Sequence, residues 1–388
     1  MEEFLKGKVV KSFCPRREEA ERQPARHQLD PCATELLYFP KRCHRPREPI
    51  FNAMATVLRD IPSLKVTVLK EIAKVPTKCV TEARLRRALK VGPESVVEGF
   101  DLAQTLVDYI TEAGRFTDDV LPPWLFKAGR PALRLKNSKI SGKYLGRIVD
   151  SVGRELVELD VSGTFQIDDA AVAYVLDKCS KLRSLNIRNC RKITDATLDV
   201  VVAKGGQLTA LDIGGDVNIS AAGVRALVGS KKMGALRELN LSGLPVRDDV
   251  LSVVAKGGQR LAALGIGFTD VGEGALREFL VQRGAQLERL GLHWLCASAT
   301  SPPETQLSAE FVFEFLAQHC PRLTDLDVSG QKHVSAPALQ QFVDAKLAAA
   351  DAGRGVALVT LKAKFIGSSR ALVEQVVGGS HPYLKLEA

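Results

Sequence analysis

Motifs for metal binding, disulfide pairing and membrane insertion are scarce in this sequence of 388 residues, and each absence excludes a class of protein. The eight cysteines form no Cys-x-x-Cys pair and the six histidines show no ligand spacing, so we expect neither a disulfide scaffold nor a metal site. No apolar run approaches the roughly 18 residues of a membrane-spanning helix. The first residues lack the basic start and apolar block of a secretory signal, so we expect an intracellular protein, cytoplasmic or nuclear, with no membrane contact.

Catalytic motifs are missing as well. The sequence contains no GxxxxGK(S/T), HExxH or GxSxG pattern. Gly265 and Gly267, followed by Gly272, have the outline of a dinucleotide-binding loop, but they fall on strand positions of the repeat described below rather than in a strand-to-helix turn. We therefore expect no catalytic residue and no cofactor, and the protein is predicted not to be an enzyme.

The composition is that of a folded protein, with 45% hydrophobic and 26% charged residues, but the net charge of +9 is unevenly distributed. Residues 1–153 hold 28 Lys and Arg against 19 Asp and Glu, whereas residues 154–388 hold 26 of each. Bulk charge therefore gives no support for nucleic-acid binding by the second part. The basic first part, in contrast, is compatible with RNA or another acidic surface.

A leucine repeat organises the chain from Arg154 onward. It has the form L-x-x-L-x-(L/I/V)-x-(G/N), and its second leucines are separated by 26, 26, 28, 25 and 26 residues. A seventh copy is centred on Leu326, and weaker copies lie at residues 133–137, 359–361 and 384–386. Such regularity predicts an array of stacked repeats. The six second leucines are Leu159, Leu185, Leu211, Leu239, Leu264 and Leu290.

Each repeat has the chemistry of one strand followed by one helix. Leucines at alternate positions point to one face of an extended chain, and an Asp, Ser or Thr after the strand can cap the helix that follows. Asp168, Thr194 and Ser220 are such caps. Gly205-Gly206 and Gly257-Gly258 are predicted to end two helices in left-handed conformations. Because a single unit cannot bury its apolar face, the units must stack into one continuous core.

Three segments carry a resemblance to a known family: Cys179-Ser-Lys-Leu182, Leu185-Asn-Ile187-Arg-Asn189-Cys190 with Ile193-Thr194-Asp195, and Cys320-Pro-Arg-Leu323. They resemble the cysteine-containing class of leucine-rich repeats, the F-box/ribonuclease-inhibitor-like class found in ubiquitin-ligase receptors. The resemblance implies an α/β solenoid with parallel strands on its concave face, helices on its convex face and an N-terminal helical cap. It also implies that Cys179, Cys190 and Cys320 fill small buried spaces between turns.

Three regions are predicted along the chain. Residues 1–53, rich in proline and charge, are expected to be disordered or extended, residues 54–130 to be helical, and residues 131–388 to form the solenoid. The helical region has two interpretations, since it either closes the apolar end of the first repeat or docks an adaptor. The second rests on Ser63-Leu64-x-x-x-Val68-x-x-x-Ile72, which resembles the elongin-binding box of cullin-ligase substrate receptors, although Val68 stands where that family has cysteine.

A candidate binding surface follows from the strand register. If Leu159 and Val161 point inward, residues 158, 160 and 162 face the concave side, and the same holds in every repeat. Six carboxylates against two arginines at these positions predict an acidic hollow that favours a basic or amine-bearing peptide. Gly265, Gly267 and Gly291 predict a bare patch for a partner's backbone, and the alternative is a column of small polar residues with no ligand. The candidate residues are Glu158, Asp160, Asn186, Arg188, Asp212, Glu238, Asn240, Arg289, His293, Asp325 and Asp327.

The pattern as a whole favours a non-enzymatic scaffold that recognises another protein on a curved sheet. The family resemblance implies a substrate receptor of a cullin-RING ubiquitin ligase, with residues 54–130 contacting the adaptor. The alternative is a structural subunit of a large assembly, in which the basic residues 1–153 lie against RNA or another acidic surface.

Overall fold

The computed structural model describes residues 131–295, 308, 311–378 and 384–387, with isolated positions between 108 and 126. The predictions for residues 1–53, for Ser63, Leu64, Val68 and Ile72, and for a loop at residues 299–305 lie outside the described residues. The described part contains one ten-stranded sheet in which every strand lies parallel to its neighbours in sequence order. The prediction of a leucine-rich-repeat solenoid is therefore confirmed.

Short strands alternate with helices throughout the described residues. The strands are β1 (Ala132–Arg134), β2 (Glu158–Asp160), β3 (Ser184–Asn186), β4 (Ala210–Asp212), β5 (Glu238–Asn240), β6 (Ala263–Gly265), β7 (Arg289–Gly291), β8 (Asp325–Asp327), β9 (Thr360–Lys362) and β10 (Lys385–Glu387). The α-helices are α6 (Gly142–Val152), α7 (Asp169–Lys178), α8 (Asp195–Lys204), α9 (Ala221–Gly229), α10 (Asp248–Gly257), α11 (Glu273–Arg283), α12 (Leu316–His319), α13 (Ala336–Asp351) and α14 (Arg370–Val373).

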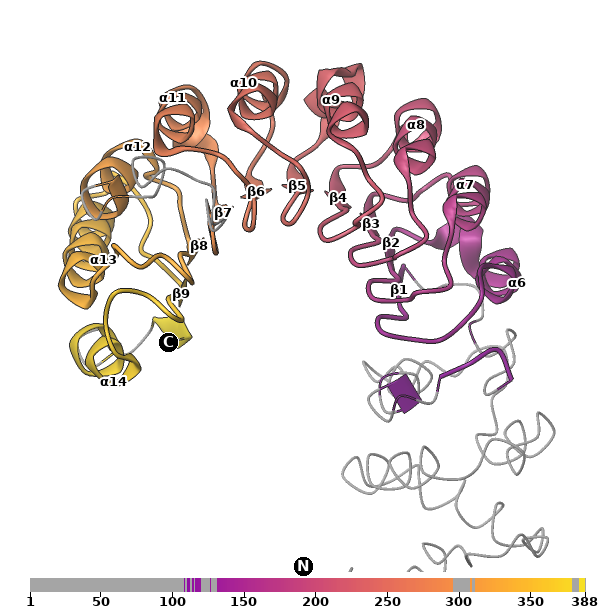
Figure 1. Ribbon diagram of the computed structural model, residues 1–388, viewed down its shortest axis with the longest axis horizontal. Helices are drawn as coiled ribbons and strands as arrows, with labels where there is room; N and C mark the ends of the chain where they lie inside the picture. Colours follow the sequence, from indigo (N-terminus) through magenta and orange to yellow (C-terminus); the bar gives the residue numbers. More distant parts are fainter. Residues whose placement is uncertain are drawn as a thin grey trace, which may run out of the picture.

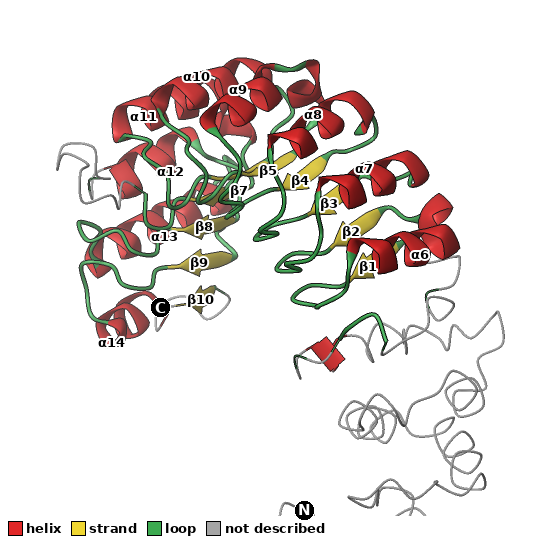
Figure 2. Ribbon diagram, turned by 45° about the vertical axis from the view of Figure 1, so that its right-hand side comes forward, coloured by secondary structure: helices red, strands yellow, loops and turns green. Residues whose placement is uncertain are grey.

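The chain bends into an open arc. Strands line the inner side of the arc and helices the outer side, and the two ends of the sheet do not meet (Figure 1). Seen from a second direction, the strands run side by side beneath a single layer of helices (Figure 2). The described residues include no helix with the length and apolar character needed to cross a membrane.

One leucine at the centre of each strand sets the register. Leu159 pairs with Leu185 and Leu185 with Leu211, and the central leucines of β1 to β9 are at most 2% exposed. The flanking strand residues are partly exposed, which is the alternation predicted from the sequence. In β9 the paired residue is Leu361 rather than Val359, which is 53% exposed.

The three cysteines of the family resemblance are buried, as predicted, and their thiols are free. Burial raises the pKa of Cys179 to about 11 and that of Cys190 and Cys320 to about 12, so all three remain neutral thiols at pH 7. The Cys190 thiol also donates to the carbonyl of Val161 in the preceding repeat, at 3.3 Å. These cysteines therefore act as core residues that join successive turns.

Glycines at the helix ends have a different role from the predicted one. Gly205 ends α8 with a φ of −72° and Gly258 follows α10 with a φ of −80°, so neither is left-handed. A Cβ atom on Gly205 would lie 2.5 Å from the carbonyl oxygen of Val201, and one on Gly258 would lie 2.8 Å from that of Val254. Glycine is required there because the chain passes close to the helix, not because of its backbone angle.

A ladder of carboxylates joins the starts of several helices to the segment that begins the next repeat's helix. Asp169, the first residue of α7, accepts hydrogen bonds from the Thr194 amide at 2.9 Å and the Thr194 hydroxyl at 2.7 Å, and also from the Thr197 hydroxyl. Asp195 accepts from the amide and hydroxyl of Ser220 in the same way. Equivalent bonds join Asp118 to Ser141, Asp248 to Gly272 and Glu273 to Ser308.

We predict that Asp169→Ala destabilises the fold by about 1–3 kcal/mol, because it leaves the partly buried groups of Thr194 and Thr197 without an acceptor. Burial alone would raise the pKa of Asp169, but the hydrogen bonds from Thr197 and Thr194 outweigh it and lower the pKa. The contribution of Asp169 is therefore present above the unfolded-state pKa of about 4 and is lost as the pH falls through the lower folded-state pKa.

Urea unfolding of the wild type and Asp169→Ala at pH 7 and at pH 3 measures both effects. The difference between the two proteins should shrink at the lower pH. Asp199→Ala, on an exposed position of α8, is the matched control and should change the free energy of unfolding by less than about 0.5 kcal/mol. Equal effects of the two substitutions would contradict the proposed ladder.

Candidate functional site

Three rows of side chains cross the concave sheet. The first row consists of the residues just before each central leucine, the second row of the residues just after it, and the third row of the residues two positions further on. Glu238, Asn240 and Ser242 are the three positions in the repeat of β5. Every concave-face candidate predicted from the sequence lies in one of these rows.

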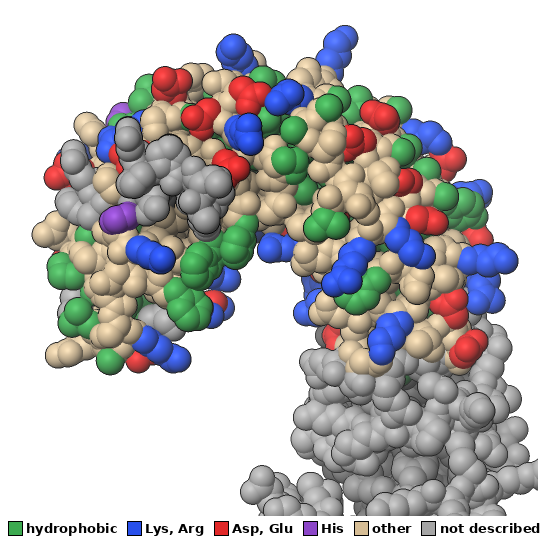
Figure 3. Space-filling view, viewed as in Figure 1, with side chains coloured by type: hydrophobic (Ala, Val, Ile, Leu, Met, Phe, Trp, Pro, Cys, Tyr) green, Lys and Arg blue, Asp and Glu red, His purple; other side chains and the backbone are tan. Residues whose placement is uncertain are grey.

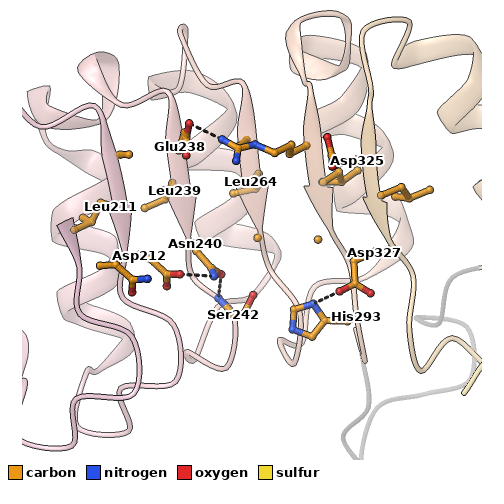
Figure 4. Close-up of a pocket in the computed structure, with 18 of the residues that line it drawn as sticks. Leu211, Asp212, Glu238, Leu239, Asn240, Ser242, Leu264, His293, Asp325 and Asp327 are labelled. Carbon is orange, nitrogen blue, oxygen red and sulfur yellow. Dashed lines mark hydrogen bonds and ion pairs between the residues drawn. The ribbon is translucent and has the colours of Figure 1, made fainter. Parts of the chain in front are cut away.

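A hollow of about 440 Å³ lies over the middle of the arc, between β3 and β9. Its floor is formed by the central leucines and by small residues, including Ala210, Ala263, Gly265 and Gly291. Charged and polar side chains stand on both sides of this floor (Figure 4). Eight of the predicted candidates line the hollow, namely Asn186, Asp212, Glu238, Asn240, Arg289, His293, Asp325 and Asp327. Glu158, Asp160 and Arg188 are not among its lining residues.

The second row serves the backbone. The side chain of Asp160 accepts the amide hydrogen of Ser162 at 2.9 Å, and Asp212 accepts that of Gly214 at 3.0 Å. Because each bond holds the turn that follows a strand, these Asp and Asn side chains are already used by the fold. The same bond recurs from Asn186 to Arg188, from Asn240 to Ser242 and from Asp327 to Ser329.

In the repeats of β6 and β9 the second-row residues, Gly265 and Lys362, cannot accept this hydrogen bond, and a serine of the preceding repeat replaces the missing acceptor. The amide of Gly267 donates to the hydroxyl of Ser242, in the preceding repeat, at 3.1 Å. The amide of Lys364 donates to the hydroxyl of Ser329 at 3.2 Å, because Lys362 cannot accept. Ser242 and Ser329, both at most 8% exposed, are therefore structural residues of the third row.

The first row carries charges that the turns do not use. Arg289 forms an ion pair with Glu238 at 2.5 Å, and both side chains remain about half exposed, at 50% and 47%. Asp325 accepts a hydrogen bond from the neighbouring Thr324 hydroxyl at 2.7 Å and is partly exposed. In the lining as a whole four carboxylates face Arg289 and Lys362, so the hollow has an excess of negative charge.

Burial also changes the protonation of groups in the hollow. Burial raises the pKa of Asp212, against the opposing effects of the Gly214 amide and the Asn240 side chain. Burial lowers the pKa of His293, although Asp327, with its carboxylate 3.6 Å from the imidazole, acts in the opposite direction. At pH 7 the imidazole is therefore neutral, with one nitrogen as donor and the other as acceptor, and its Nδ1 is buried on the side of Asp327.

The predicted bare patch is smaller than the sequence suggested. A Cβ atom on Gly267 would lie 2.3 Å from the imidazole of His293, so that ring occupies the space beside this glycine. Gly267 is buried, whereas Gly265 and Gly291 are partly exposed. A Cβ atom on Gly265 would lie 2.5 Å from the side-chain oxygen of Asn240, so the bare floor is limited to Gly291, and Gly267 serves to admit the imidazole.

Sequence reasoning missed a row of aromatic residues beside the hollow. The turn after each of the strands β1 to β9 contains a residue with positive φ, which is Gly or Asn in six repeats. In three others it is Phe268, Trp294 or Phe365, with φ values of 53°, 53° and 56°. A bulky side chain in this conformation raises the free energy of the folded state by about 1–2 kcal/mol. Its presence therefore indicates that the side chain itself has a role.

These aromatic rings stack on one another at the surface. The ring centroids of Phe268 and Trp294 are 6.0 Å apart with nearly parallel planes, and Phe365 lies 6.0 Å beyond Trp294. Phe268 is 54% and Phe365 is 74% exposed, and hydrophobic side chains gather along the inner edge of this arm (Figure 3). The His293 ring, 5.3 Å from that of Phe268, connects this aromatic row to the hollow.

Comparison with known proteins places this chain beside other proteins without assigning it to a family. No family model matches the sequence. The Caenorhabditis elegans protein EEED8.10, whose name describes RNA binding, is 26% identical over 236 residues. The match covers 54% of this chain and 30% of that protein, so this chain spans less than a third of the relative's length.

Three solved structures have a similar architecture. The yeast Rad7–Elc1 complex contains a chain of 16% identity with a TM-score of 0.42, and the match covers 86% of this chain and 96% of that one. The leucine-rich-repeat-containing protein LegL7 of Legionella pneumophila has 15% identity and a TM-score of 0.42, covering 68% and 86%. Internalin C2 of Listeria monocytogenes has 17% identity and a TM-score of 0.32, covering 52% and 80%. None of these likenesses assigns a partner or an activity to this chain.

Proposed function

We propose that this protein is a non-enzymatic scaffold whose concave face holds an extended segment of another protein. The observation that carries the proposal is the hollow over β3–β9, where a floor of small residues lies between side chains that the fold does not use. Ala210, Ala263 and Gly291 leave room for a peptide backbone, and Glu238, Arg289 and Asp325 are placed to contact its side chains. A rigid sheet pays little ordering cost on binding, which favours recognition of a flexible partner.

The charge of the hollow indicates the chemistry of the segment. Four carboxylates exceed the two cationic residues of the lining, and Asp325 has no ion pair among the described residues. A Lys, an Arg or a free amine of the partner would therefore gain a charge-assisted hydrogen bond in the first row. The segment is accordingly basic or amine-bearing.

The aromatic row gives the same segment a second contact. Phe268, Trp294 and Phe365 offer exposed ring surface next to the hollow, and His293 lies between the two sites. Backbone strain retained at three of these turns is a feature of functional surfaces rather than of solenoid cores. A proline, aromatic or aliphatic side chain of the partner would pack on these rings.

At a finer level we infer a role as substrate receptor of a cullin-RING ubiquitin ligase, with residues 54–130 contacting the adaptor. Support comes from the resemblance of Ser63, Leu64, Val68 and Ile72 to an elongin-binding box. The competing role is that of a structural subunit whose basic residues 1–153 lie on RNA. The excess of Lys and Arg in residues 1–153 and the name of the C. elegans relative favour that alternative.

We predict that Ala210→Arg abolishes peptide binding, because it fills the floor of the hollow with a large cation. The probe is a set of random 12-residue phage-displayed peptides selected on the wild type, which should be enriched in Lys and Arg. The matched control is Ala203→Arg, on the exposed side of α8, which should bind these peptides as the wild type does. Equal binding by the Ala210→Arg variant would contradict the concave site, and selection of acidic peptides would contradict its proposed chemistry.

The Phe365→Asn variant should separate stability from binding. Asn occupies the equivalent turn position at Asn137 and Asn189, so the substitution should stabilise the fold by about 0.5–1 kcal/mol through relief of backbone strain. It should also weaken the binding of the selected peptides about threefold to tenfold. Urea unfolding and fluorescence anisotropy measure the two effects, and the reverse substitution Asn137→Phe should destabilise without improving binding. A loss of stability in Phe365→Asn would assign the ring a structural role instead.

The receptor role predicts that Leu64→Asp abolishes recovery of elongin and cullin when the full chain is purified from cell extract. The leucine would insert into the adaptor's groove, and a carboxylate cannot enter an apolar pocket without a large desolvation cost. Peptide binding on the concave face should be unchanged. Lys65→Asp, next to the motif leucine, is the control, and unchanged adaptor recovery with Leu64→Asp would overturn the receptor role.

A further inference from the structure

Charge is segregated between the two edges of the sheet. The segments that lead from each helix into the next strand form what we call the amino-terminal edge, made of residues 153–157, 179–183, 205–209, 230–237, 258–262, 284–288, 320–324 and 352–359. These segments contain nine Lys and Arg residues but only two carboxylates, Glu155 and Glu288. The net charge of zero in residues 154–388 therefore conceals a strongly basic edge.

Most of these cations lack a partner. Lys181 pairs with Glu155 at 2.7 Å, Arg322 pairs with Glu288 at 3.2 Å, and Lys232 is buried. The other six are exposed and have no ion pair within the described part of the chain. They follow one another along the arc as Arg154, Arg183, Lys231, Arg237, Arg260 and Arg354.

The fold does not account for these six residues. Lys204 and Lys256, in the last turns of their helices, are favourably placed for the helix dipole, whereas the six lie beyond the α-helices. The opposite edge of the sheet also carries cations in its turns, but there they stand next to the carboxylates that begin the helices, such as Asp169, Asp195 and Asp248. The amino-terminal edge has no such row of compensating carboxylates among its described residues.

We propose that the amino-terminal edge binds the phosphodiester backbone of a single-stranded nucleic acid. A protein partner would require an apolar centre to its interface, but the only large exposed hydrophobic residues on the described part of this edge are Val356 and Val359, at its far end. A phosphate backbone is bound through charge alone and needs no apolar contact. The site is separate from the hollow, so it does not depend on the proposed function.

The shape of the edge favours a single strand over a duplex. The strands and their connections follow the curve of the arc (Figure 1), so the six cations lie along a bent path. A duplex is stiff over about 150 base pairs and bends over a short length only at a considerable energetic cost. A single strand can follow the curve and place successive phosphates against successive repeats.

The test uses the full chain and a fluorescein-labelled single-stranded RNA of 20 uridines, with binding followed by fluorescence anisotropy. The triple variant Arg183→Gln, Arg237→Gln, Arg260→Gln should bind at least tenfold more weakly at 100 mM salt. The slope of log K against log salt should fall by about 2, because each phosphate contact to a single strand contributes about 0.7. Circular dichroism should show an unchanged fold, since all three side chains are exposed.

A charge-matched control removes three cations from the opposite edge through Lys139→Gln, Arg247→Gln and Lys332→Gln, which are also exposed. Like the test variant, it leaves the basic residues 1–138 unchanged, and its affinity for the single strand should fall less than twofold. An equal loss of affinity in the two variants would show that binding depends on overall charge, and would contradict the proposed site. Two further probes are a 20-base-pair RNA duplex and vesicles containing phosphatidylserine. If either bound as tightly as the single strand and lost as much affinity in the first triple variant, the proposal would also be overturned.

Discussion

The burial of one leucine beneath the centre of every strand is the interaction on which this fold depends. Leu185 pairs with Leu159 and Leu211, and it can do so only if each repeat returns the chain to the same register after a helix and two turns. Parallel pairing of ten such strands leaves polar backbone groups at every turn. Two devices satisfy them, the Asp or Asn of the second row and the carboxylates that begin the helices.

The spacing of leucines was sufficient to predict the solenoid and the register, because these depend on periodicity alone, whereas the burial of the cysteines was implied by the family resemblance. The carboxylate ladder could not be predicted in the same way. The sequence marks Asp169 as a helix-starting residue, but its partner Thr194 lies 25 residues away, and only the stacking of repeats brings the two together. The error at Gly205 and Gly258 has a local cause, since each close carbonyl oxygen lies four residues earlier in the same helix and accepts the amide hydrogen of the glycine itself.

For the candidate site, the sequence predicted which side chains face the hollow but not which of them are free. Asp212 and Asp327 were interpreted as contacts for a partner, yet each holds the amide of its own turn. Glu238, Arg289 and Asp325 remain available because the first row precedes the turn and has no amide to satisfy. The aromatic row was missed because Phe268, Trp294 and Phe365 are isolated in the sequence. When the repeats are aligned on their central leucines, all three fall at the turn position where other repeats have Gly or Asn.

The same argument applies to charge. A net charge is a sum over the chain, whereas a solenoid projects each phase of its repeat onto a different surface. Carboxylates concentrate at the helix starts and in the hollow, where amides, hydroxyls and the helix dipole favour them. Cations are thereby left to the segments that enter the strands, and Arg183, Arg237 and Arg260 gather on one edge although the region is neutral overall. For a repeat protein, the position of a charged residue within its repeat is therefore a better guide to the partner than the total charge.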